Sequence, residues 1–174
     1  YEWLSPWLGV FERKRAHREM DAPPRAADAD ILLFGLGRFG AAVAAHLREG
    51  GGRLLSVDFD PETVRRHTHD GSAARYGGAE DPEFVAALPL DQMRWVVSRV
   101  RDRVINAMLL HSLRQQCYKG RIAVAASKHH DADLLREQGV DLVLIPYADA
   151  AREAAERLLG KQPDLTAITT GEMK

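Results

Sequence analysis

A short apolar run that leads directly into three spaced glycines constrains the fold of this chain more than any other feature. The run spans residues 31–34, and it continues as the motif G-x-G-x-x-G, with glycines at Gly35, Gly37 and Gly40. Apolar residues then recur every four positions, at Phe39, Val43 and Leu47, which predicts one apolar face of a helix. Between a strand and a helix, such glycines allow a sharp turn, close approach of a pyrophosphate and close helix–strand packing. We therefore expect an anion to bind at the first turn of this helix.

A carboxylate ends the next apolar strand, which is predicted over residues 53–58. This acid is Asp58, and it follows the glycine motif at roughly the ~20-residue spacing at which an acid accepts hydrogen bonds from a ribose 2′-hydroxyl. Because a carboxylate would repel a 2′-phosphate, Asp58 favours an unphosphorylated ribose and disfavours NADP. The alternative is a tight strand-to-helix turn that binds nothing.

The rest of the chain alternates apolar strands with helical segments. Further strands are predicted over residues 73–76, 95–98, 121–126 and 142–146. Two helices are predicted to start at Asp-Pro-Glu sequences, with Asp60 and Asp81 as N-caps. Later helices are predicted from the stripe at 105, 109 and 113, ending near Gly120, and over residues 131–138 and 149–159.

This alternation predicts an α/β fold, a Rossmann-like doubly wound parallel sheet of six strands with helices on both faces. Parallel strands need crossover helices, and right-handed crossovers lead to the strand order 3-2-1-4-5-6. Ligands of such sheets bind at the carboxyl ends of strands one and four. The crevice expected there brings the glycine motif together with Asp58, the turn at 76–80, Ser98 and Arg99.

Composition indicates an ordinary globular domain. The chain has 174 residues, of which 45% are hydrophobic and 28% charged, so we expect one main domain with a sizeable core. Its net charge of -1 gives no reason to expect a nucleic-acid partner. The single cysteine, Cys117, falls in a helical pattern, where we expect it to be buried in a protein of a reducing compartment.

The two ends of the chain differ from its middle. Residues 1–20 carry an aromatic stripe at Trp3, Trp7 and Phe11, followed by a cluster of basic residues. This pattern predicts an amphipathic helix, either a connector where the chain leaves a membrane or a helix docked on its own domain or a dimer mate. Residues 21–30 have the composition of a linker, and residues 161–174 that of a loosely docked tail, so the domain proper is expected over 31–160.

No catalytic constellation is evident in the sequence. The sheet uses nearly the whole chain, and no tyrosine is followed four residues later by the lysine that short-chain dehydrogenases use. Two histidine groupings, at 67–69 and 129–130, have neighbouring acids but lack the spacing of a zinc site, and helix ends explain them. We therefore expect ligand binding without catalysis and without a metal.

The motif Gly35-Leu-Gly-Arg-Phe-Gly40 followed by Asp58-Phe-Asp-Pro61 resembles the N-terminal domain of the RCK (Trk-N) family, which regulates potassium transport. More narrowly, it resembles the cytoplasmic domain of Kef-type monovalent cation:proton antiporters, over roughly residues 31–160. The resemblance implies a homodimer on the cytoplasmic side of a bacterial inner (plasma) membrane, linked to a transmembrane antiporter domain in the same polypeptide. It also implies an adenine nucleotide ligand that gates ion transport, with AMP expected first and ATP or NAD(H) as alternatives.

The same resemblance implies roles for individual residues. The phosphates would be held by Gly35, Leu36, Gly37, Arg38, Phe39 and Gly40. The ribose side would be formed by Asp58, Phe59 and Asp60, and the adenine side by Gly78, Ala79 and Glu80. Asn106 resembles a common asparagine of the family that faces the cleft, while Ser98 and Arg99 are expected there from the strand order alone, with Arg99 near a phosphate. The chain departs from the family at 77–79, where Gly-Asp-Ala is usual: here the sequence is Gly-Gly-Ala, and acids occur only at Glu80 and Asp81.

Two other functions stay open on the sequence alone. One is a small NAD-dependent oxidoreductase, and the other is a structural dimerisation domain whose glycine loop holds no ligand.

Overall fold

The computed structural model describes residues 28–69 and 72–160. The predicted N-terminal helix, nearly all of the predicted linker and the predicted tail lie outside these residues. The sheet has six strands: β1 (Ile31–Phe34), β2 (Leu54–Asp58), β3 (Ala73–Tyr76), β4 (Trp95–Ser98), β5 (Arg121–Ala125) and β6 (Leu142–Leu144). All neighbouring pairs are parallel, and their order is β3-β2-β1-β4-β5-β6. The predicted fold class and strand order are confirmed.

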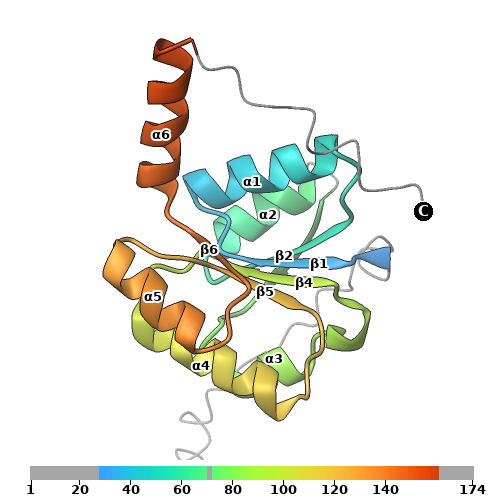
Figure 1. Ribbon diagram of the computed structural model, residues 1–174. Helices are drawn as coiled ribbons and strands as arrows, with labels where there is room; N and C mark the ends of the chain where they lie inside the picture. The colour runs from blue at the N-terminus through green and yellow to red at the C-terminus, as the bar shows by residue number, and fades with distance from the viewer. Residues whose placement is uncertain (1–27, 70–71, 161–174) are drawn as a thin grey trace, which may run out of the picture.

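Helices cover both faces of this sheet (Figure 1). They are α1 (Arg38–Glu49), α2 (Pro61–His69), α3 (Pro82–Ala86), α4 (Arg103–Gln115), α5 (His129–Glu137) and α6 (Pro146–Leu158), with a 3-10 turn η3 at Leu90–Gln92. Figure 1 shows α1 and α2 on one face and α3, α4 and α5 on the other. Among the described residues, no helix is both long enough and apolar enough to cross a bilayer.

The strands are apolar throughout because each face of the sheet is covered. Successive side chains of a strand point to opposite faces. Leu32 and Phe34 accordingly belong to the core cluster shared with α3 and α4, whereas Ile31 and Leu33 belong to the cluster shared with α1 and α2. A run buried on both faces is the pattern of a central parallel strand.

The register of β1 with its two neighbours brings three strand ends together. Phe34 is level with Val57 of β2 and with Ser98 of β4. The residues that follow these strands, Gly35 after β1 and Arg99 after β4, therefore lie beside Asp58 at the carboxyl edge of the sheet. This edge is where ligands bind in open α/β sheets.

The predicted helix starts are correct where an aspartate caps the helix. Asp81 accepts hydrogen bonds from the N–H groups of Glu83 and Phe84, and Asp60 accepts one from Glu62 N–H at 3.0 Å. Helix α5 begins at His129, two residues earlier than predicted, and β6 ends at Leu144 because Pro146 occupies the first position of α6.

The prediction for the end of α4 is wrong. The helix ends at Gln115, not near Gly120, and Cys117 adopts a left-handed conformation with φ 52°. Tyr118 N–H bonds to Leu113 C=O and Cys117 N–H bonds to Arg114 C=O, which is the Schellman pattern. Because this turn leaves the helix, Cys117 is exposed rather than buried.

Candidate functional site

The three motif glycines occupy structurally different positions. Gly35 has φ +92°, a conformation that favours glycine, and its N–H bonds to Val57 C=O at 2.8 Å. At Gly40, a Cβ atom would overlap the carbonyl oxygen of Gly35, so α1 can pack against the turn only without a side chain there. At Gly37, an added Cβ would have only the guanidinium of Arg99 as a close neighbour, with Nη1 3.0 Å away. Folding therefore explains Gly35 and Gly40, whereas Gly37 keeps the outer surface of the loop open.

Helix α1 presents its positive end to this surface. Gly37 provides no side-chain cap, and the first turn contains no acidic residue. The first hydrogen bond of α1 joins Ala41 N–H to Gly37 C=O at 2.8 Å. The N–H groups of residues 38–40 come before this bond and therefore have no acceptor within the helix. These N–H groups and the dipole of a twelve-residue helix suit an anion.

Arg99 adds a positive charge directly over the loop. Its N–H bonds to Phe34 C=O at 2.9 Å, which fixes the backbone at the end of β4. Its side chain then runs across the glycines, because Cδ would lie 3.7 Å from a Cβ on Gly35 and 3.5 Å from one on Gly40. Within the described part of the chain, no carboxylate forms an ion pair with Arg99. The guanidinium is thus available to an anion on the loop.

Asp58 connects the loop to β2. Its side chain is only 7% exposed, and Oδ2 accepts the N–H of Leu36 at 2.6 Å while Oδ1 accepts the N–H of Asp60 at 2.9 Å. A carboxylate has about four lone-pair sites, so two of them remain for further donors. Asp58 therefore anchors the glycine loop and retains the capacity to accept hydrogen bonds from a hydroxyl group.

The residues beside Asp58 form the outer rim of this edge. Phe59 is 75% exposed, and Tyr76, which is level with Asp58 in the register, is 59% exposed. Asp60 caps α2 and also accepts Thr63 Oγ1–H at 2.6 Å. The hydrogen bond from the Thr63 side chain, followed by that from Glu62 N–H, lowers the pKa of Asp60. The carboxylate of Asp60 is thus engaged with α2.

The turn after β3 lies next to Asp58. Gly77 N–H bonds to Asp58 C=O at 3.1 Å, and a side chain at Gly77 would overlap the ring of Phe84. Ala79 is buried, whereas Glu80 is exposed at the end of the turn. Of the predicted adenine-side residues, Glu80 is the one whose side chain reaches solvent.

Ser98 and Asn106 are buried and hold the loop that carries Arg99. Ser98 Oγ–H donates to Asn106 Oδ1 at 2.7 Å, and Asn106 Nδ2–H donates to Val100 C=O at 2.8 Å. Ser98 Oγ also accepts Val100 N–H at 3.3 Å. Because Asn106 is only 3% exposed and both ends of its amide are engaged, its side chain holds the loop at 98–100 in place.

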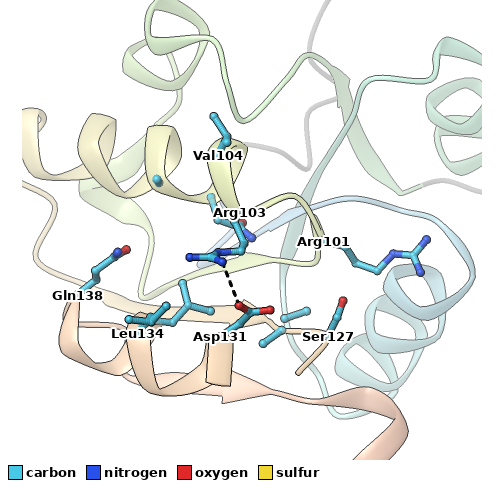
Figure 2. Close-up of a pocket in the computed structure, with 12 residues that line it drawn as sticks. Arg101, Arg103, Val104, Ser127, Asp131, Leu134 and Gln138 are labelled. Carbon is cyan, nitrogen blue, oxygen red and sulfur yellow. Dashed lines mark ion pairs between the residues drawn. The ribbon is translucent and has the colours of Figure 1, made fainter. Parts of the chain in front are cut away.

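A cavity of 460 Å³ lies between α4 and α5 (Figure 2). Leu134 of α5 and Gln138, the C-cap of α5, line it, and an ion pair of 3.5 Å joins Arg103 of α4 to Asp131. Asn106 is the one predicted site residue in its lining. The sequence analysis missed this cavity, because its lining comes from three separate segments, 101–107, 125–127 and 131–138, with no shared motif. In the described part of the chain, no three metal-ligating side chains gather in one place.

The structure therefore brings part of the predicted site together. The glycine loop, Asp58 and Arg99 meet at one edge of the sheet, with Phe59 and the turn before Glu80 beside them. Leu36 contributes its backbone, since its side chain lies in the core, and the Arg38 side chain is exposed while Phe39 is half-buried. Sequence reasoning missed the hydrogen bond between Leu36 N–H and Asp58. This bond depends on the register of β1 against β2, which the sequence does not specify.

A parallel sheet in this order, with a glycine-rich turn after β1 and an acid after β2, defines a Rossmann-like domain of the kind that binds nucleotides. Residues 31–146 match the TrkA-N domain family, and the chain belongs to this family.

The comparisons with individual proteins agree with this assignment. The chain is 27% identical over 138 residues to the Ktr system potassium uptake protein A of Vibrio alginolyticus, covering 79% of this chain and 63% of that protein. The TrkA-N domain of inner membrane protein ybaL from Escherichia coli has a TM-score of 0.67 at 21% identity, covering 75% of this chain and 96% of that one. The Kef CTD of Shewanella denitrificans in its AMP-bound form has a TM-score of 0.64 at 17% identity, covering 79% and 84%. The two structural likenesses support the fold alone.

Proposed function

We propose that this TrkA-N domain is the ligand-sensing regulatory domain of a monovalent cation:proton antiporter, with potassium as the expected cation, and that an adenine nucleotide controls it. The observation that carries the proposal is the convergence on Gly37 of an uncapped helix N-terminus and the Arg99 guanidinium. AMP is the proposed ligand, and ATP and NAD(H) are the alternatives. The Kef CTD in its AMP-bound form supports this choice.

The phosphate would bind on the open surface of the glycine loop. Backbone N–H groups of residues 38–40 would donate to its oxygens, and Arg99 would neutralise its charge. The exposed Arg38 side chain is a second cation at the same helix end. The ribose would then lie over Asp58, whose remaining lone pairs would accept its hydroxyl hydrogens. Phe59 would cover this part of the ligand.

Regulation without catalysis is part of the proposal. The relatives named above are a potassium uptake protein and a domain of an inner membrane protein. The ligand would act by binding one arrangement of the protein more tightly than another, which shifts the population by that difference in affinity.

We further propose that the domain acts as a homodimer on the cytoplasmic side of the inner membrane, joined through residues 1–30 to a transmembrane antiporter domain in the same polypeptide. Helix α6 supports the dimer, because none of its residues is buried and Figure 1 shows it standing away from the sheet. Its last turn exposes Leu158 by 88%, and Leu159 follows it. An apolar helix end of this kind suits packing on a second copy.

Calorimetric titration of the purified 174-residue protein with AMP, ATP and NADH tests the ligand. We expect binding by the wild type and loss of binding in Gly37→Val, since the new side chain would fill the surface of the loop. The control is Ala42→Val, the same kind of addition at an exposed position of α1. Equal affinity of both variants, or no binding by the wild type, would remove the proposal. Oxidation of NADH by the protein would favour the oxidoreductase instead.

Ion flux tests the regulatory role. In vesicles containing the full-length transporter, saturating AMP should change the rate of cation-dependent proton movement, and Gly37→Val should abolish the change. Identical flux with and without AMP would exclude gating even if AMP binds.

A further inference from the structure

We propose that the Glu80 carboxylate binds the exocyclic amino group of an adenine base and makes the site specific for adenine over 6-oxopurines such as hypoxanthine. This inference rests on the proposed function, because it concerns the base of the same nucleotide. It gives a role to Glu80, which directly follows the sequence Gly-Gly-Ala at 77–79, where the family usually has Gly-Asp-Ala.

The strand order determines where a base would lie. The loop that would hold the phosphate follows β1, and Asp58, which would hold the ribose, ends the neighbouring strand β2. Adjacent strands are about 4.8 Å apart, so each step across the sheet is close to the size of one nucleotide component. The next strand in the same direction is β3, and its turn is joined to Asp58 by the bond from Gly77 N–H to Asp58 C=O. A base attached to that ribose would therefore meet the turn at 77–80.

Glu80 occupies the space that a side chain at position 78 would fill. A Cβ atom on Gly78 would lie 2.5 Å from Glu80 Cδ and 2.6 Å from Oε2, and closer still to Oε1. The carboxylate of Glu80 thus lies over the Cα atom of Gly78. Where the family has Asp in the second position of this turn, the present chain places a carboxylate from two residues further along.

Glu80 is also the acid of this turn that remains available. The neighbouring Asp81 caps α3 by accepting hydrogen bonds from the N–H groups of Glu83 and Phe84, at 3.0 and 3.1 Å. Glu80 is exposed, and within the ranges 28–69 and 72–160 no hydrogen bond or ion pair engages its carboxylate. A donor on the ligand would give this carboxylate a partner.

The chemistry of the carboxylate decides which base it accepts. An ionised carboxylate only accepts hydrogen bonds. Adenine carries an amino group at C6, which donates, whereas hypoxanthine and guanine carry an oxygen at C6, which accepts. A 6-oxopurine would place two acceptors against each other, so it would lose the hydrogen bond to the charged carboxylate that adenine makes.

The experiment compares AMP with IMP by calorimetric titration, because IMP has an oxygen in place of the amino group at C6 and carries a proton on the neighbouring N1. We expect wild-type protein to prefer AMP by about tenfold or more, the range for a hydrogen bond to a charged group. In Glu80→Ala the preference should fall to within about threefold, through weaker AMP binding. The double variant Gly78→Asp, Glu80→Ala should regain the preference, since Asp at 78 would enter the space that Glu80 leaves. The control Glu83→Ala removes an exposed acid of α3 and should leave the ratio unchanged.

The outcomes separate this inference from the proposed function. Tight binding of both AMP and IMP by the wild type, with no preference, would overturn the role of Glu80 and leave nucleotide binding intact. An unchanged preference in Glu80→Ala, with a melting curve like that of the wild type, would do the same. Absence of binding for both nucleotides would overturn the proposed function and this inference together.

Discussion

At the scale of single residues, the glycine loop separates the requirements of folding from those of binding. Gly40 is needed because the backbone of Gly35 occupies the place of its side chain, whereas the only close neighbour of a side chain at Gly37 is the flexible end of Arg99. Two glycines of one motif should therefore respond differently to the same substitution.

We predict that Gly40→Ala lowers the free energy of unfolding by about 3 kcal/mol, because the methyl group forces α1 away from the turn. Gly37→Ala should change it by less than about 0.5 kcal/mol, as expected for a change at an exposed position. Urea denaturation followed by circular dichroism measures both. A Gly40→Ala protein as stable as Gly37→Ala would show that the close packing of helix and turn is not required.

The charge of Arg99 gives a second prediction at this scale. Arg99→Gln should weaken AMP binding about tenfold or more, the range for a hydrogen bond to a charged group, and leave adenosine binding unchanged. Arg101→Gln is the matched control, because Arg101 lies two residues further along the same loop and is exposed. Titration with AMP and adenosine measures the difference. Equal losses for both ligands would indicate a damaged loop rather than a lost phosphate contact.

At the scale of elements, three helices end in the same hydrogen-bonded turn but with different residues in the left-handed position. Gly51 after α1 and Gly139 after α5 have φ +81° and +83°, and Cys117 after α4 has φ 52°. In each turn, the N–H group of the left-handed residue and that of the next residue donate hydrogen bonds to carbonyl oxygens in the last turn of the helix. Only the cysteine has a Cβ atom that opposes this conformation.

We predict that Cys117→Gly stabilises the protein by about 0.5–1 kcal/mol. The left-handed conformation costs a residue with a Cβ atom about 1–2 kcal/mol, and glycine removes this cost. The greater backbone freedom of glycine in the unfolded chain offsets part of the stabilisation. Thermal and urea denaturation under reducing conditions measure the change, with Cys117→Ala as the control that removes the thiol alone. A Cys117→Gly protein less stable than Cys117→Ala would contradict the prediction.

At the scale of the whole molecule, the free energy of unfolding should fall at alkaline pH because of the half-buried Tyr118 side chain. Burial, and then the negative charge of Asp141, raises the pKa of Tyr118 from 10.0 to about 12. Because the unfolded chain loses this proton first, the contribution of Tyr118 is complete below pH 10 and is lost as the pH rises towards 12.

We predict that the free energy of unfolding falls between these two pH values more steeply in the wild type than in Tyr118→Phe. The exposed Tyr147 provides the control, since Tyr147→Phe should keep the wild-type slope. Urea denaturation at a series of alkaline pH values measures the slopes. Parallel slopes for all three proteins would show that Tyr118 titrates alike in the folded and unfolded states.

Much of the whole fold could be predicted from the sequence because it follows from local patterns. Apolar runs set the strands, and their alternation with helices leaves few possible strand orders. The site could be predicted less well. The burial of Asn106 depends on contacts with Ser98 and Val100, and the position of Glu80 depends on the missing side chain of Gly78. Such contacts arise from tertiary packing, so residue types and spacing do not specify them.

The double engagement of Asp58 restricts how this domain could be redesigned. Exchanging that acid is the obvious route to a ligand with a phosphorylated sugar, but here the same carboxylate ties Leu36 to Asp60 across two strand ends. Replacing it with a neutral or basic residue would release the turn that shapes the cleft. For the proposed ribose contact, a change of sugar preference therefore needs at least one additional substitution that supplies a new anchor for the backbone at position 36.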